Sequence, residues 1–465
     1  MPQPTVTPIA GKPNLLLGAF TVADIGYTAQ EFFVSGSATS YSAVAECLSD
    51  GRWNTVPSDT ADFTTRVVVL TPSDSVDTTS FTGTVLVEWL NVSGGIDAPA
   101  LWFMAHREMV RQGCIYVAVS AQQVGVQGGE SLGGADMSLK TLDPQRYAPL
   151  HHPGDAYAFD IFSQVGQLIR AGELTTLAPE IVVAVGESQS AMFLTTYINA
   201  VDPHAAVFDG FLVHSRFGPA APLDGHSILD SPDVPQQVRF RPDLRAPTLT
   251  VITETDLIDS RLPGYHAARQ PDDNMLRAWE IPGTSHADNY TIQVAPIDTG
   301  SAPISALVAA YAPLDTLMGQ KLAHSINFAP QHHYVLQAAL AALCDWVRTG
   351  DAAPSGSRLE LTATEPRQLS LDVDGIAIGG IRTPWVDVPI ARTSGVVDSD
   401  FPMASLFGSG APFDADTLGR RYPGGVAEYL ALFTAALDSA IAAGFLLAAD
   451  RDEIVELASQ TYPTG

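Results

Sequence analysis

The chain has 465 residues, of which 46% are apolar and 16% are charged, which excludes a disordered protein and provides enough chain for a sizeable core. Its formal net charge is −27, from 51 acidic and 24 basic residues. A negative field of this size repels phosphate backbones and anionic lipids. We therefore expect neither a nucleic-acid partner nor a membrane partner, and the oligomeric state stays open.

The N-terminal residues and the three cysteines bear on the compartment. The first 20 residues lack a basic segment followed by an apolar core, so no signal peptide is predicted, and no run of 18 apolar residues predicts a membrane span. Cys47, Cys114 and Cys344 lie far apart and match neither a zinc-ligand spacing nor an even disulfide framework. We therefore expect a cytoplasmic protein, and secretion directed by an upstream signal that has been removed stays open as the alternative.

Apolar runs bounded by turn residues recur along the chain and predict strands. Residues 31–42 are rich in β-branched and aromatic residues and are expected to form strand pieces. Continuous apolar runs follow at 66–70, 84–90, 115–120, 181–185, 208–214, 248–253 and 275–281. Runs without a polar face suit strands that helices cover on both sides, as in a parallel sheet.

Segments with apolar residues at a spacing of three to four lie between these runs and predict helices at 102–112, 155–171 and 191–201. The alternation of strand and helix predicts an α/β fold with three layers and a mostly parallel central sheet.

Two long connections and the C-terminal part complete the expected organisation. The connections, at about 121–154 and 216–246, are expected to be lid-like insertions in a core that spans residues 1–350. The core ends with a strong helical pattern at 334–347. Residues 351–465 are expected to form a C-terminal extension or cap that packs on the core.

The sharpest local pattern is Gly186-Glu187-Ser188-Gln189-Ser190, which lies between an apolar strand and a helical segment. This is the context of a nucleophile elbow, in which a serine on a strained turn presents its hydroxyl above the edge of a sheet. The residues two before and two after that serine must be small, because the strand and the helix approach closely there. A serine-rich helix N-terminus after a buried strand is the alternative interpretation.

Residues farther along the chain favour the nucleophile. His286 follows the last predicted strand, and Glu254 and Asp256 follow the strand before it, which is the order expected for this type of site. A serine needs an imidazole to accept its proton, and the imidazole needs a carboxylate to fix its tautomer. Asp256 is favoured as the acid because Thr253 to Asp256 fits the spacing of a common Gly-x-x-Asp pattern. Glu254 is the first alternative and Asp259 the second.

A developing oxyanion needs two backbone N–H groups. We expect one from Gln189, the residue after the nucleophile, and the other from Asn91 or Val92 in the loop after the run at 84–90. His214 ends a predicted strand and is expected to bind substrate. The sequence has no metal-binding motif and no nucleotide-binding glycine pattern, so neither a metal nor a cofactor is expected.

Six segments together resemble a known family; they are 26–41, 85–95, 185–191, 248–256, 282–288 and 379–389. In these segments the chain is similar to serine hydrolases of the α/β-hydrolase fold. More narrowly, it resembles a large bacterial family of esterase-like proteins known as the "alpha/beta hydrolase domain" family. The resemblance covers nearly the whole chain and implies a catalytic triad of Ser188, His286 and either Asp256 or Glu254.

These expectations combine into one function. We expect a serine esterase that hydrolyses a carboxylic ester of a small to medium, largely uncharged organic molecule through an acyl-enzyme. Acyl transfer to an alcohol and hydrolysis of a lactone or an amide use the same groups and stay open as alternatives. A binding module without catalysis on a hydrolase scaffold is an alternative of another class, because a fold does not fix a function.

Overall fold

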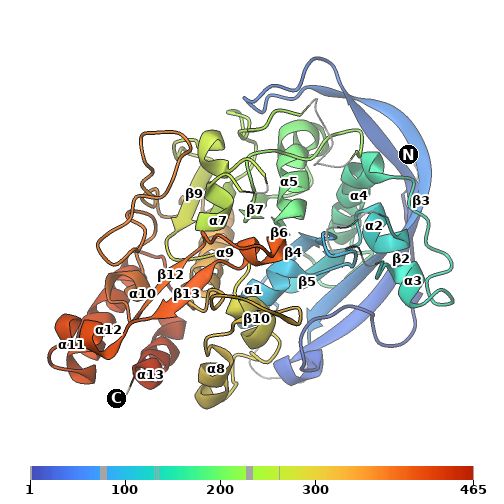
Figure 1. The fold of residues 1–465 in the computed structure, drawn as a ribbon. Coiled ribbons are helices and arrows are strands. Elements are labelled where there is room, and N and C mark those ends of the chain that lie inside the picture. Colours follow the sequence, from blue (N-terminus) through green and yellow to red (C-terminus); the bar gives the residue numbers. More distant parts are fainter. Residues whose placement is uncertain are drawn as a thin grey trace.

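The computed structural model describes residues 3–73, 81–129, 131, 134, 136–226, 234–260 and 262–463. Parts of both expected insertions, at 130, 132–133, 135 and 227–233, lie outside the described residues. One large sheet with helices on both faces forms the centre of the described part, and the segment after residue 350 lies to one side of it (Figure 1).

Nine strands form this sheet in the order β1-β2-β3-β5-β4-β6-β7-β8-β9. Their bounds are β1 Thr5–Ile9, β2 Tyr27–Ala43, β3 Thr55–Pro72, β4 Thr84–Trp89, β5 Ile115–Val119, β6 Ile181–Glu187, β7 Gly210–His214, β8 Thr248–Thr253 and β9 Leu276–Ile281. The pairs from β1 to β5 are antiparallel, and those from β5 through β4 to β9 are parallel. The sheet is mostly parallel, which confirms the expected fold class.

The differences from the predicted strands lie at the antiparallel end of the sheet. The short strands expected at 31–42 are part of one long strand, β2, which has 17 residues. β2 pairs with the 18-residue β3 to form a long antiparallel ribbon. β1 is not predicted by the sequence pattern at all. Residues 56–60 of β3 are exposed. An exposed strand carries little apolar alternation, so this part of the ribbon gives only a weak signal in the sequence.

Alternate residues of the parallel strands face two separate cores. Leu86 of β4 belongs to the same hydrophobic cluster as residues of α1 (Ala100–Arg111) and α9 (Gln331–Thr349). Its neighbours Val85 and Val87 belong to a cluster with residues of α4 (Ala158–Arg170) and α5 (Gln189–Thr196). Successive side chains of a strand point to opposite faces, so a strand buried on both faces needs apolar residues at nearly every position.

The remaining helices are α2 Gln123–Gln127, α3 Leu139–Leu142, α6 Asp202–Ala205, α7 Glu254–Leu257, α8 Ile304–Ala310, α10 Pro384–Asp387, α11 Ala415–Arg421, α12 Val426–Ala442 and α13 Arg451–Thr461. Two short strand pairs are β10 Thr316–Leu317 with β11 Gln320–Lys321, and β12 Ala391–Ser394 with β13 Ser409–Pro412. The helix predicted at 191–201 is divided, because a π-helical turn follows α5. Among the described helices, none alone has the length and hydropathy to cross a membrane; α11 and α12 meet that criterion only as a pair bent by 64°.

The C-terminal segment packs against α9 through aromatic side chains. Trp385 of α10 stacks on Tyr334 of α9 with ring centroids 5.6 Å apart, and Phe433 of α12 meets Trp385 edge-on at 5.5 Å. β12 then leads directly to Gly395, whose N–H donates to the Glu254 carboxylate after β8. The segment after residue 350 thus reaches the loops at the carboxyl edge of the sheet, whereas the boundary at residue 350 stays a prediction.

Candidate active site

Ser188 occupies a strained turn between β6 and α5. Its φ of 59° and ψ of −121° make it one of four described residues other than glycine with a positive φ. Such a conformation persists only where the surrounding structure enforces it, and it is the conformation expected at a nucleophile elbow. A Cβ at Gly186 would lie 3.1 Å from the Ser190 carbonyl oxygen, so the strand and the helix approach closely at this turn.

Ser190 stabilises the same turn with its hydroxyl. The hydroxyl donates to the Glu187 carbonyl oxygen at 2.7 Å and accepts from the Glu187 N–H at 3.1 Å. Both groups flank the nucleophile position and are buried. A serine therefore suits the position where the wider fold has a second glycine, because its small side chain also satisfies two buried backbone groups.

The imidazole of His286 links Ser188 to Asp256. His286 Nε2 lies 2.8 Å from Ser188 Oγ, and His286 Nδ1 lies 2.6 Å from Asp256 Oδ1. We call these three residues the Ser–His–Asp relay. In this arrangement the Nδ1–H group of His286 donates a hydrogen bond to Asp256. The lone pair of Nε2 is then available to accept the serine proton.

The two other carboxylates considered for the acid bind elsewhere. Glu254 accepts hydrogen bonds from the N–H groups of Gly283 and Gly395, at 2.5 and 2.7 Å, and from the Ser394 hydroxyl at 3.0 Å. It therefore fastens the loop before His286 to the C-terminal segment. Asp259 is half-exposed and accepts from the Gly264 N–H at 2.7 Å. The geometry favours Asp256 as the acid.

The sequence reasoning missed Glu187 as a member of the site. Its Oε1 lies 3.7 Å from His286 Nε2, so a second carboxylate faces the imidazole on the side opposite Asp256. Burial raises the pKa of Glu187 to about 7, against the opposing influence of the His286 charge. The signal available in the sequence was a carboxylate directly before the nucleophile, at the buried end of a strand.

The charges around His286 favour its protonated form. Burial disfavours a charged imidazole and lowers its pKa. The nearby carboxylate of Asp256, which is also hydrogen-bonded, outweighs burial together with the carboxylate of Glu187. The pKa of His286 therefore lies above its usual range. Phe217, from the second expected insertion, stacks on the imidazole with ring centroids 5.3 Å apart. The imidazole is therefore held by two carboxylates at its nitrogens and by an aromatic ring at its face.

The expected oxyanion donors differ in their backbone partners. Gln189 begins α5, so its N–H lacks a partner within the helix. The Asn91 N–H donates to the Ala98 carbonyl at 3.0 Å and is thereby engaged. Val92 follows in the same loop and is 4% exposed. Gln189 and Val92 therefore remain the candidates for the oxyanion hole.

His214 lies below the nucleophile in a buried polar chain. It is fully buried, its carbonyl accepts from the Ser188 N–H at 2.9 Å, and its Nε2 lies 2.9 Å from His332 Nε2. His332 in turn binds Asp288, with Nδ1 3.1 Å from Oδ2. Full burial makes His214 a support beneath Ser188 and leaves it no exposed surface toward a ligand.

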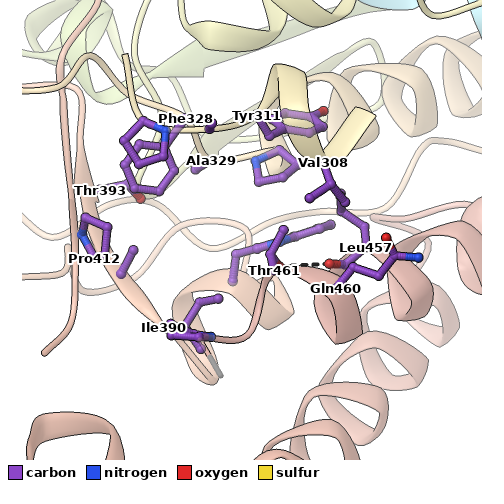
Figure 2. Close-up of a pocket in the computed structure, with 16 residues that line it drawn as sticks. Val308, Tyr311, Phe328, Ala329, Ile390, Thr393, Pro412, Leu457, Gln460 and Thr461 are labelled. Carbon is purple, nitrogen blue, oxygen red and sulfur yellow. Dashed lines mark hydrogen bonds between the residues drawn. The ribbon is translucent and has the colours of Figure 1, made fainter. Parts of the chain in front are cut away.

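A cavity of about 330 Å³ lies apart from the relay, between α8, the start of α9, β12 and α13 (Figure 2). Its lining includes Tyr311, Phe328 and Thr393, and no residue of the Ser–His–Asp relay is among the 16 that line it. No charged side chain occurs among these lining residues either. In the part of the chain that the structure describes, no group of three or more His, Cys, Asp or Glu side chains could hold a metal ion.

Comparisons with known proteins agree with this architecture. Residues 3–456 match the model of a family described as "Alpha/beta hydrolase domain". The search of curated proteins found no match. Similar solved structures include a serine hydrolase without a lid from Xanthomonas campestris (13% identity, 59% of this chain and 93% of that chain, TM-score 0.32). Another is a Rhizomucor miehei esterase (11% identity, 68% of this chain and 85% of that chain, TM-score 0.32). A third is a dienelactone hydrolase from Anabaena variabilis (14% identity, 57% of this chain and 96% of that chain, TM-score 0.27). At these identities and TM-scores, no conclusion about this chain is drawn from the solved structures.

Proposed function

The chain belongs to the alpha/beta hydrolase domain family, and on that premise we propose that it hydrolyses carboxylic esters through an acyl-enzyme on Ser188. One observation carries the proposal: the continuous hydrogen-bonded path from Ser188 Oγ through His286 to Asp256, with links of 2.8 and 2.6 Å. A serine hydroxyl at its ordinary pKa is a weak nucleophile, and this path supplies the base that it needs.

The first step acylates the serine. Ser188 Oγ attacks the ester carbonyl carbon while His286 Nε2 takes the hydroxyl proton, and the carbonyl π electrons move onto the oxygen. The N–H groups of Gln189 and Val92 are proposed to bind that oxyanion. The oxyanion then reforms the carbonyl, the bond to the alcohol oxygen breaks, and His286 Nε2 returns the proton to the departing alcohol.

The second step releases the acid. Water loses a proton to His286 Nε2 and attacks the acyl carbon, and collapse of the tetrahedral intermediate breaks the bond to Ser188 Oγ, which recovers its proton. Asp256 keeps Nδ1 protonated in both steps and stabilises the imidazolium that forms. The proposed substrate is a small to medium, largely uncharged ester, because the carboxylates of Asp256 and Glu187 and the net charge of −27 disfavour an anion.

The test combines a substrate with a probe that needs none. Wild type is expected to hydrolyse short p-nitrophenyl esters and to react with a fluorophosphonate, and Ser188→Ala is expected to lose both reactions. Ser439→Ala is the matched control and should still be labelled, because Ser439 is exposed on α12 and its hydroxyl donates to the Ala435 carbonyl. Labelling that persists in folded Ser188→Ala would contradict the proposal. A wild type that neither reacts with the probe nor hydrolyses any ester would favour a binding module.

A further inference from the structure

Glu187 places a second carboxylate beside the catalytic imidazole. Asp256 contacts Nδ1 of His286, and Glu187 Oε1 lies 3.7 Å from Nε2, the nitrogen that exchanges a proton with Ser188. We propose that Glu187 is a positioning residue that stabilises the imidazolium of His286 from the Nε2 side. This inference rests on the proposed function, because it concerns the base of the same reaction.

The orientation of the Glu187 side chain is fixed from the neighbouring strand. Asn91, just after β4, donates from Nδ2 to the Glu187 carbonyl oxygen at 3.1 Å and to Oε2 at 3.4 Å. Asn91 is itself oriented by the Ser93 N–H, which donates to its Oδ1 at 2.8 Å. The contact with Asn91 engages Oε2 of Glu187, and the other carboxylate oxygen, Oε1, faces His286. The side chain is only 11% exposed, so water screens its charge weakly.

A carboxylate at this position acts more strongly on the transition state than on the resting enzyme. When Ser188 Oγ bonds to the acyl carbon, its proton moves to His286 Nε2, and the ring becomes a cation between Asp256 and Glu187. The neutral imidazole gains little from Glu187, whereas the imidazolium gains a nearby opposite charge. An interaction that strengthens as the reaction proceeds raises the rate of the chemical step.

Titratable groups from several elements set the charge state of this pair. Burial is the main cause of the raised pKa of Glu187; the charge of Asp256 on α7 raises it further, whereas the charges of His286 and of His332 on α9 lower it. Glu88 on β4 is protonated near neutral pH, because burial raises its pKa to about 8. Burial, together with the charges of His332 and His286, lowers the pKa of His214 on β7, so its ring stays neutral. Glu187 has a raised pKa of about 7, so above that pH it is the carboxylate that faces Nε2 with a charge to contribute.

The experiment replaces the charge and keeps the shape. Glu187→Gln retains a side-chain oxygen for Asn91 and removes the carboxylate from His286. We expect the acid limb of kcat/KM against pH to move to lower pH, because Glu187 raises the pKa of His286. The plateau of kcat above pH 7, where Glu187 is charged, should fall about tenfold. Glu187→Asp keeps the charge but shortens the side chain, so it should shift the limb in the same direction by less.

Glu88→Gln is the matched control, because it replaces a buried carboxyl on the adjacent strand that is already neutral below pH 8. It should leave the acid limb where it is in wild type. The imidazole of His286 can also be titrated by NMR without substrate, and its pKa should fall in Glu187→Gln and not in Glu88→Gln. An unchanged acid limb and an unchanged His286 titration in Glu187→Gln would overturn the inference. An inactive wild type would contradict the proposed function instead, and the NMR titration would still decide the role of Glu187.

Discussion

Thr253 donates two hydrogen bonds to one oxygen of Asp256. Its N–H and its hydroxyl lie 2.9 and 2.7 Å from Asp256 Oδ2, and the other oxygen, Oδ1, lies 2.6 Å from His286 Nδ1. Thr253 and Asp256 are both fully buried. Thr253 therefore orients the carboxylate toward His286, and the threonine at the position of the usual glycine contributes its side chain to that orientation.

Thr253→Val should weaken catalysis more than folding. The change keeps the volume of the side chain and removes the hydroxyl that fixes Asp256, and a hydrogen bond to a charged group contributes about 1.5–3 kcal/mol. We expect kcat to fall about tenfold or more, measured on a p-nitrophenyl ester. Thr250→Val on the same strand is the control, because its hydroxyl binds the Val213 carbonyl. Equal losses of kcat in both variants would contradict the role of Thr253.

The two neighbouring carboxylates should respond in opposite ways. Asp256→Asn leaves His286 with the wrong tautomer, so kcat should fall by a factor on the order of 10⁴ with little change in stability. Glu254→Gln leaves one of its backbone donors without an acceptor, so the free energy of unfolding should fall by about 1–3 kcal/mol. Steady-state kinetics and urea unfolding of both variants separate the effects. A larger loss of kcat in Glu254→Gln would make Glu254 the acid.

Stability should fall as pH rises through the range in which Glu88 titrates. Burial raises the pKa of folded Glu88 to about 8, and its ordinary value is 4.5. Between these values the folded protein holds a proton that the unfolded chain has released, so each unit rise in pH costs up to about 1.4 kcal/mol from this group. Urea unfolding of wild type and Glu88→Gln from pH 5 to 8 measures the effect. The difference in stability between the two should change with pH; a constant difference would contradict the expected shift.

Gly186→Ala should damage the nucleophile turn. The added Cβ would lie 3.1 Å from the Ser190 carbonyl oxygen and 3.2 Å from its carbon, which forces β6 and α5 apart beside Ser188. We expect the fluorophosphonate reaction to slow at least tenfold, since overpacking at a buried contact costs about 1–3 kcal/mol. Gly419→Ala is the control, because a Cβ there meets no atom within 4 Å. A labelling rate as fast in Gly186→Ala as in Gly419→Ala would show that the turn tolerates the methyl group.

The long-range arrangement at the acid position could not be predicted from local sequence. Glu254 and Asp256 follow the same strand, and both satisfied the expected order of residues. They lie two positions apart on α7, which rotates their side chains by about 200° relative to each other, since each residue of a helix turns about 100°. One carboxylate therefore reaches His286, whereas the other reaches Gly283 and Gly395.

The contact of Glu187 with His286 was equally hidden. Glu187 is the last residue of β6, and His286 follows β9, 99 positions later in the chain. In the sheet, two further strands lie between β6 and β9. The hydrogen bond from Asn91 to Glu187 also depends on the pairing of β4 with β6. No pattern along the chain encodes such contacts, because they arise only when separate strand ends meet at one edge of the sheet.

The sequence by itself determined the features that depend on neighbouring residues. Strands buried on both faces require continuous apolar runs, and a nucleophile turn requires small residues around Ser188, so both left signals within a few positions. Only the tertiary structure decided which carboxylate contacts His286, that a second one faces its other nitrogen, and that His214 is buried beneath the site. The physical reason is that these choices depend on which side chains from distant elements meet in a buried space, where each polar group must find a partner.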